Sequence, residues 1–149
     1  MGQLGETLAR HDIVGVDTSP FIYLWEQHPR YLPLAEELFL HLRQPQMQGI
    51  TSVITLIEAC IHPQRQGRPD LVQAYENSLL HSQQIRMLPI DATLAHRAVI
   101  LRAAYEIHVP DALQISAAIE SGATLFVTND RRLSKVQEIE ILLLDDYLD

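Results

Sequence analysis

The chain has 149 residues, of which 47% are apolar and 20% are charged, so we expect one folded domain and exclude disordered, collagen-like and disulfide-scaffold proteins. Nineteen acidic residues against eleven basic ones give a net charge of −8, and Lys135 is the only lysine. This balance excludes nucleic-acid binding through bulk positive charge, so a nucleic-acid substrate would require local arginines or bound cations.

Short aliphatic runs alternate with segments of helical periodicity along the chain. In chain order, the pattern predicts a strand at 13–16, a helix at 18–26, a helix at 31–43, a strand at 49–53, a helix at 55–61, a loop at 62–69, a helix at 70–83, a strand at 85–90, a helix at 91–105, a helix at 110–122, a strand at 124–128, a helical turn at 131–136 and a strand at 139–144. The loop is predicted because its polar sequence contains two prolines and a glycine.

The alternation of strands and helices indicates the fold class. Because several strands are continuous aliphatic runs, they are typical of a parallel sheet that is covered on both faces. We therefore predict a three-layer α/β fold. The single domain is expected at 13–149, preceded by an N-terminal extension at 1–12.

Three features bear on the cellular compartment. The longest aliphatic run, 141–144, is too short for a membrane helix. The first twelve residues lack the apolar stretch of a signal peptide. Cys60 is the single cysteine, which excludes an internal disulfide or a thiolate zinc site. We therefore expect a cytoplasmic protein that does not associate with a membrane.

Two aspartates follow predicted strands directly. Asp17 follows the first strand and Asp130 follows the fourth. In open α/β sheets the ligand crevice lies beyond the carboxyl ends of the strands, at the point where the strand order reverses. Both residues are therefore candidates for chemistry, although an aspartate at such a position is also a common helix cap or turn residue.

Two further acids lie on predicted helices, close to apolar faces. Glu58 is one helical turn from Ile54 and Ile61, so its carboxylate is expected at the apolar face or its edge. Asp111 projects over the same face as Ile115. The structural alternatives are a glutamate that reaches an arginine or water, and an aspartate that complements the dipole of a first helical turn.

Together, the four acids suggest a metal site. Carboxylates that converge in one crevice repel one another and destabilise the fold unless cations neutralise them. Ligands that are all oxygen favour Mg²⁺ or Mn²⁺ over zinc. Such ions activate water and stabilise the charge that develops on a phosphodiester during displacement.

The four acids occur in segments that resemble a known family. Asp17 in IVGVDTSPFIY, Glu58 in TSVITLIEA, Asp111 in VPDALQISAAIESGA and Asp130 in LFVTNDRRL are similar to the PIN-domain ribonucleases, most closely the toxins of VapBC-type toxin–antitoxin pairs. This resemblance implies a five-stranded parallel sheet of order 3-2-1-4-5 and an Mg²⁺- or Mn²⁺-dependent endoribonuclease. It also implies that the four acids bind the metal, that Thr128 supports them, and that the protein forms homodimers inhibited by a small antitoxin.

Four arginines are candidates for gripping RNA, because a guanidinium binds phosphate in a bidentate manner. They are Arg65 and Arg68 in the predicted loop, and Arg131 and Arg132 beside Asp130. Their structural alternative is exposure to solvent without a role.

Two other functions remain open at this point. The first is a PIN fold that binds or regulates without catalysis. The second is phosphoryl transfer with Asp17 as the nucleophile, for which the only available lysine is Lys135. Asp145 and Asp146, after the last strand, are predicted to be surface acids.

Overall fold

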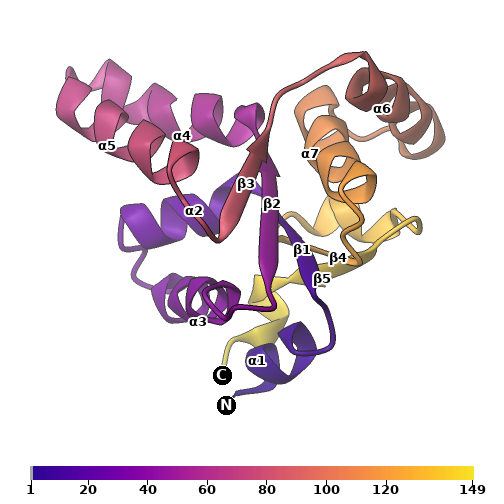
Figure 1. Ribbon diagram of the computed structural model, residues 1–149, viewed down its shortest axis with the longest axis horizontal. Helices are drawn as coiled ribbons and strands as arrows, with labels where there is room; N and C mark the ends of the chain where they lie inside the picture. Colours follow the sequence, from indigo (N-terminus) through magenta and orange to yellow (C-terminus); the bar gives the residue numbers. More distant parts are fainter. Residues whose placement is uncertain (1) are drawn as a thin grey trace.

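Five parallel strands form the centre of the computed structural model, which describes residues 2–149 (Figure 1). The strands are β1 (Ile13–Val16), β2 (Gln48–Ser52), β3 (Ile85–Leu88), β4 (Leu125–Thr128) and β5 (Glu140–Leu143). Their order across the sheet is β3-β2-β1-β4-β5. The predicted α/β class and strand order are therefore confirmed, and the strand order reverses at β1, where Val14 pairs with Gly49 of β2 and with Leu125 of β4.

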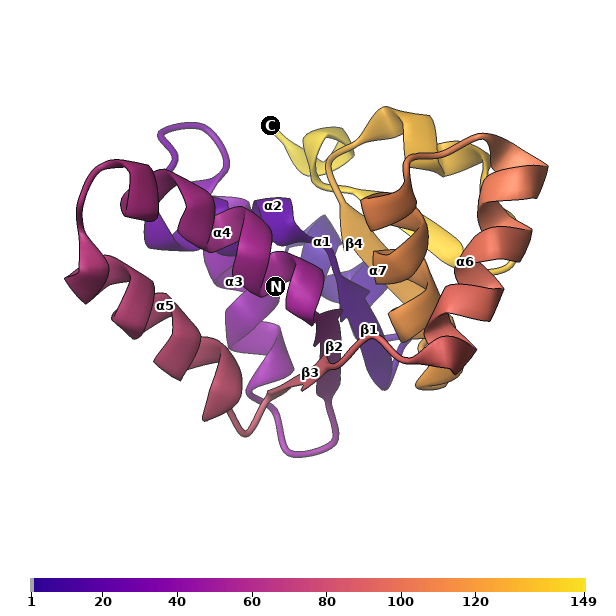
Figure 2. The ribbon, with the colours of Figure 1, turned by 90° about the horizontal axis from the view of Figure 1, so that it is seen from above.

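Helices cover both faces of this sheet (Figures 1 and 2). They are α1 (Gln3–Leu8), α2 (Thr18–Trp25), α3 (Leu32–Leu42), α4 (Val53–Arg65), α5 (Pro69–Leu80), α6 (Ala92–Tyr105) and α7 (Val109–Glu120), with 3₁₀ turns η1 (Arg131–Lys135) and η2 (Leu144–Tyr147). Val14 and Val16 pack with Phe21 of α2 and Leu38 of α3, whereas Phe126 faces α6 and α7. Among residues 2–149, no helix combines the length and the apolar character needed to cross a membrane.

Helix α7 packs so closely on the sheet that β1 has no room for a side chain at Gly15. A Cβ at this position would lie 2.5 Å from the Cβ of Ala118 and 2.9 Å from Cδ1 of Phe126. Because strands alternate their side chains, Gly15 faces α7 while Val14 and Val16 face the other layer. This contact fixes α7, and with it Asp111 in the first turn of α7, against the central strand.

The segment at 62–69 is not the predicted loop. Helix α4 continues to Arg65 with Pro63 inside it, and only the short connection before Pro69 is irregular. Pro63 is buried in this helix, and backbone bonds continue beyond it, because the amide of Arg68 donates to the carbonyl of Pro63 at 3.0 Å. Packing of α4 against α5 outweighs the local tendency of proline to end a helix.

The first residues fold onto the rest of the chain. Leu4 and Leu8 of α1 are buried in the same core as Leu38. The amide of Gly5 donates to Oε1 of Glu37 in α3 at 3.0 Å. Figure 1 shows α1 next to the C-terminal end of the chain. The hydroxyl of Thr7 in α1 lies 2.9 Å from that of Tyr147 in η2, the turn that follows β5.

Candidate active site

The four acids of the sequence motifs line one pocket. Asp17 directly follows β1, Glu58 lies on α4, Asp111 lies in the first turn of α7 and Asp130 follows β4. The pocket has a volume of about 450 Å³, and its lining also includes Thr18, Ser19, Ile22, Tyr23, Thr128, Asn129 and Arg131. Asp17 and Asp130 meet here because β1 and β4 are parallel neighbours whose carboxyl ends lie at the same edge of the sheet.

Asp17 is the most buried of the four, with 8% of its surface exposed. Oδ1 accepts a hydrogen bond from the backbone amide of Thr18 at 2.9 Å, and thereby caps α2, while Oδ2 accepts from the hydroxyl of Thr128 at 2.7 Å. The pKa of Asp17 is raised from 3.8 to about 6, first by burial and to a smaller extent by the charges of Asp111 and Glu58, against the lowering effect of these two donors. Asp17 is therefore a cap and a pocket carboxylate at once.

Asp111 is half-buried, and its pKa depends on the charges of the other acids in the pocket. Its pKa is raised, first by burial and then by the negative charge of Asp130, while Arg132 lowers it. Nδ1 of His108 lies 3.8 Å from Oδ2 of Asp111. The carboxylates of the pocket thus lie close enough to repel one another.

Asp130 is held by Arg132. Nε and Nη2 of Arg132 donate to Oδ1 and Oδ2 of Asp130 at 3.0 and 2.6 Å, and the backbone amide of Arg132 also donates to Oδ1. These bonds lower the pKa of Asp130. Asp130 is consequently the one pocket acid whose charge is already neutralised by a neighbouring cation.

Glu58 lines the pocket as predicted, but the isoleucines of α4 do not mark the buried face of this helix. Ile57 and Ile61 are 54% and 42% exposed, and the buried side of α4 is formed by Thr55, Ala59 and Pro63. Glu58 is exposed at the rim, where its Oε1 accepts a hydrogen bond from the hydroxyl of Thr18 at 2.7 Å. Ile57 and Ile61 therefore face solvent rather than the core, whereas Ile54 is partly buried.

The sequence-family model of the PIN domain matches residues 14–139 of the chain. The chain belongs to the PIN domain family. Solved structures with the same fold include a toxin–antitoxin complex from Klebsiella pneumoniae, at 19% identity and a TM-score of 0.64, with 89% of this chain and 97% of the other covered. VapBC2 from Rickettsia felis, bound to a promoter DNA fragment, has 19% identity and a TM-score of 0.67, with 88% and 98% covered.

A third similar structure is the sarcin–ricin loop cleaving toxin VapC20 from Mycobacterium tuberculosis. It has 19% identity and a TM-score of 0.66, with 87% of this chain and 99% of the other covered. No curated protein sequence matches the chain. At this identity, the likeness to solved structures establishes the PIN fold alone.

The site of this PIN domain contains polar residues that the sequence motifs did not single out. Thr18, Ser52, Thr55 and Gln114 form a buried hydrogen-bonded group beneath Asp17. One signal for it was present in the sequence, since Gln114 lies three residues after Asp111 in the apolar stretch of α7. A polar side chain on that face needs buried partners.

The four candidate RNA-gripping arginines separate into two groups. Arg131 lines the pocket of the PIN domain, and its Nη2 lies 2.8 Å from Oδ1 of Asp146. Arg132 holds Asp130. Arg65, on α4, and Arg68, which pairs with Asp70 at 2.8 Å, are not part of the pocket lining.

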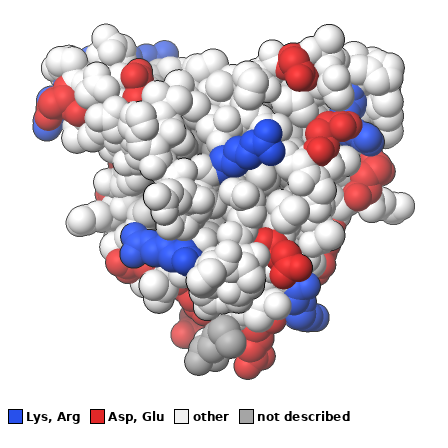
Figure 3. Space-filling view, viewed as in Figure 1, with Lys and Arg blue, Asp and Glu red and all other residues white. Residues whose placement is uncertain are grey.

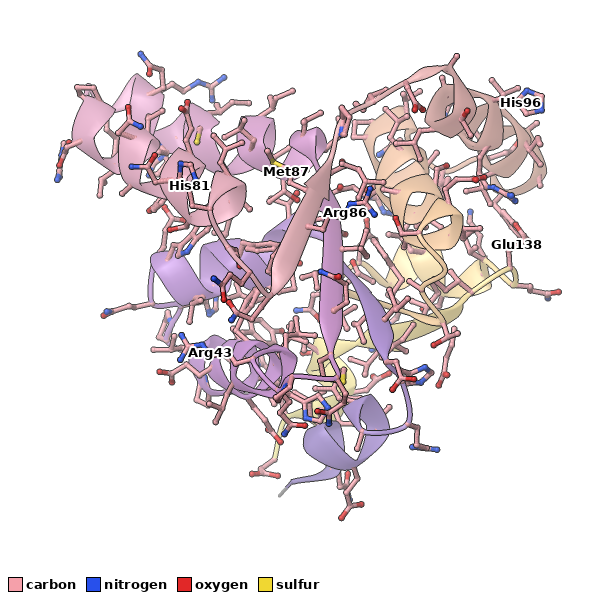
Figure 4. All side chains as sticks on the ribbon, in the orientation of Figure 1. Arg43, His81, Arg86, Met87, His96 and Glu138 are labelled. Atoms are coloured by element: carbon pink, nitrogen blue, oxygen red, sulfur yellow. The ribbon has the colours of Figure 1, made fainter. Side chains whose placement is uncertain are left out.

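Basic side chains do not gather on the face drawn in Figure 3, where they stand singly among acidic and uncharged residues. Arg43 and Arg86, labelled in Figure 4, lie at the end of α3 and on edge strand β3, and neither lines the pocket. Of the four candidate arginines, Arg131 lines the pocket and Arg132 binds Asp130.

The donor set of the pocket fits a hard divalent cation in kind. Four carboxylates and the hydroxyls of Thr18, Ser19 and Thr128 offer oxygen atoms. Within residues 2–149, however, no three acidic, histidine or cysteine side chains are already arranged to hold a metal ion. Binding of a divalent cation would therefore require rotation of the acidic side chains, and Asp130 would have to release Arg132.

Proposed function

We propose that this PIN domain is an endoribonuclease that depends on Mg²⁺ or Mn²⁺ and acts as the toxin of a toxin–antitoxin pair. The observation that carries the proposal is the pocket lined by Asp17, Glu58, Asp111 and Asp130. The raised pKa values of Asp17 and Asp111 support it, because each has a contribution from the charges of other pocket acids. A site that bears such repulsion at a cost in stability is suited to cation binding.

Each pocket residue has a part in the proposed chemistry. Asp17, Glu58, Asp111 and Asp130 would hold the metal, which supplies an activated water and stabilises the charge on the phosphodiester. The hydroxyl of Thr128 donates a hydrogen bond to Asp17 at 2.7 Å and accepts one from the backbone amide of Asp130 at 3.1 Å. Thr128 therefore fixes the two acids relative to each other. Arg131 lies at the pocket and is suited to bind a phosphate of the RNA.

The proposed partners are RNA, a small antitoxin and a second copy of the chain, all acting in the cytoplasm. The Klebsiella pneumoniae and Rickettsia felis structures are toxin–antitoxin complexes, and the Mycobacterium tuberculosis protein is a toxin that cleaves the sarcin–ricin loop. Exposed apolar side chains on α4 and α6, among them Ile57 and Val99, offer a surface for the homodimer.

The proposed activity is tested with purified protein and a labelled single-stranded RNA. We expect cleavage with Mn²⁺ or Mg²⁺ and none with EDTA, because the acids alone cannot activate water. An Asp17→Asn variant purified in parallel controls for contaminating ribonuclease. Cleavage that persists in EDTA, or that Asp17→Asn retains in full, would contradict the proposal.

Arg132 is expected to compete with the metal for Asp130. Arg132→Met should strengthen Mn²⁺ binding about 2- to 5-fold, as expected for the loss of an exposed ion pair. Mn²⁺ titration followed by electron paramagnetic resonance measures the affinity. Arg97→Met, which removes the same charge from the Arg97–Glu120 pair on α6 and α7, is the matched control. Equal affinities of the two variants would show that Arg132 does not compete.

A further inference from the structure

Gln114 is a buried amide in the second turn of α7. Only 2% of its surface is exposed, and its neighbours in the helix, Ala112 and Ile115, are buried apolar residues. A buried carboxamide requires partners for both its oxygen and its nitrogen. Those partners are Asp17, directly after β1, and residues of β2, α2 and α4, so this one side chain links the segments that carry Asp17 and Glu58.

The distances show how the amide is bonded. Oε1 accepts a hydrogen bond from the hydroxyl of Ser52 at 2.5 Å. Nε2 lies 2.8 Å from Oγ1 of Thr55, 3.1 Å from Oγ1 of Thr18 and 3.4 Å from Oδ1 of Asp17. The nitrogen therefore faces the carboxylate of Asp17 and the two threonine hydroxyls.

This orientation of the amide is determined by its partners. Oγ of Ser52 accepts the backbone amide of Ile54 at 3.1 Å, so its own hydrogen is available for Oε1 of Gln114. A flipped amide would place its oxygen against the carboxylate oxygen of Asp17, acceptor against acceptor. Gln114 is thus a donor toward the pocket.

A donor at this position directs the hydroxyl of Thr18. When Oγ1 of Thr18 accepts a hydrogen from Gln114, its own hydrogen is free for Oε1 of Glu58, which lies 2.7 Å away. The two hydrogens of this amide serve three acceptors: one is directed at Oγ1 of Thr55, the shortest contact, and the other lies between Oγ1 of Thr18 and Oδ1 of Asp17. Gln114 therefore contacts Asp17 directly and Glu58 through Thr18. The two acids come from different elements, and the amide links them.

We propose that Gln114 is a positioning residue that orients Asp17 and Glu58 for metal binding, the latter through Thr18. The inference rests on the proposed metal-dependent function, and it names a residue that contacts neither metal nor RNA. Partners that orient metal ligands typically contribute 10- to 100-fold to metal affinity. Without Gln114, Asp17 keeps the donors Thr18 and Thr128 but loses its link to α7, and the hydroxyl of Thr18 is no longer directed toward Glu58.

The test is Mn²⁺ affinity, measured by electron paramagnetic resonance. Gln114→Met keeps the length of the side chain but removes its donors, and we expect it to weaken Mn²⁺ binding about 10-fold. Ser116→Ala is the matched control, since Ser116 is buried in the same helix and its hydroxyl donates only to the carbonyl of Ala112. Circular dichroism in EDTA verifies that both variants are folded.

A second variant tests the relay and remains informative if Gln114→Met does not fold. Thr18→Val removes the hydroxyl between Gln114 and Glu58 and should also weaken Mn²⁺ binding. Both substitutions interrupt the same chain of hydrogen bonds from Gln114 through Thr18 to Glu58. The loss of Mn²⁺ affinity in the double variant should therefore be smaller than the product of the two single losses. Wild-type Mn²⁺ affinity in Gln114→Met, or in Thr18→Val, would overturn the inference.

A metal-free measurement separates this inference from the proposed function. In ¹H–¹⁵N spectra recorded in EDTA, the side-chain amide of Gln114 should exchange slowly with solvent, and its signals should shift in Thr18→Val but not in Ser116→Ala. Rapid exchange, or signals insensitive to Thr18, would refute the linkage. If the signals behave as expected but the wild type binds no Mn²⁺, the linkage stands, while the proposed metal-dependent function fails and with it the positioning role of Gln114.

Discussion

Replacement of Asp17 by asparagine is expected to stabilise the metal-free protein and to abolish RNA cleavage. Burial raises the pKa of Asp17 from 3.8 to about 6, so the ionised carboxylate costs the folded state up to about 3 kcal/mol at neutral pH. Asparagine carries no charge, and it caps helices as well as aspartate does. We therefore expect the melting temperature in EDTA at pH 7 to rise by about 5–10 °C at most.

The effect has a defined pH dependence. Below about pH 4, Asp17 is protonated in both the folded and the unfolded chain, so wild type and variant should differ least. Between pH 4 and 6 the unfolded chain releases this proton before the folded chain does, and the wild type loses stability relative to Asp17→Asn. Above about pH 6 the difference is constant. Thermal unfolding in EDTA at pH 4, 5, 6 and 7 measures this curve.

The same substitution removes an oxygen ligand and a negative charge from the pocket. We expect Mn²⁺ to raise the melting temperature of the wild type but not of the variant, since a ligand stabilises only the state that binds it. Cleavage should fall by at least about 100-fold. Asp91→Asn is the control, because Asp91 is an exposed cap of α6 outside the pocket. A metal-free Asp17→Asn that is less stable than wild type at pH 7 would make Asp17 a purely structural cap.

The sheet and the meeting of the acids were accessible from the sequence. Continuous aliphatic strands predict a parallel sheet, and topology then places residues that follow neighbouring strands at one edge. That rule located Asp17 and Asp130. The position of Asp111 followed from the period of α7, whose buried residues include Ile115. These inferences depend only on backbone geometry, which the hydrophobic periodicity of the sequence predicts directly.

Inferences that depend on tertiary partners were less reliable. The isoleucines of α4 have helical spacing, yet Ile57 and Ile61 face solvent, because spacing shows that residues share a face but not which face is covered. The sequence did not indicate that the guanidinium of Arg132 binds Asp130 two residues away, and RNA binding by Arg132 stays a prediction. The role of Gln114 depends on Ser52, Thr55 and Thr18, which are distant in sequence.

Removal of the Leu8 side chain is expected to destabilise the protein by about 2–5 kcal/mol. Leu8 is fully buried, and α1 covers the core between the sheet and α3. Leu→Ala at such a position loses the burial of the side chain and leaves a cavity. In a domain of this size, the melting temperature should fall by about 5–15 °C.

The matched control is Leu40→Ala on α3, where the leucine is 65% exposed, and its effect should stay within about 0.5 kcal/mol. Because α1 contributes no residue to the pocket that the four acids line, Leu8→Ala should retain cleavage at temperatures where it is folded. Equal melting temperatures for the two variants would mean that residues 2–12 are a dispensable extension. The expected difference would instead place them in the folding unit, where α1 stabilises the core and the buried charge of Asp17 destabilises it.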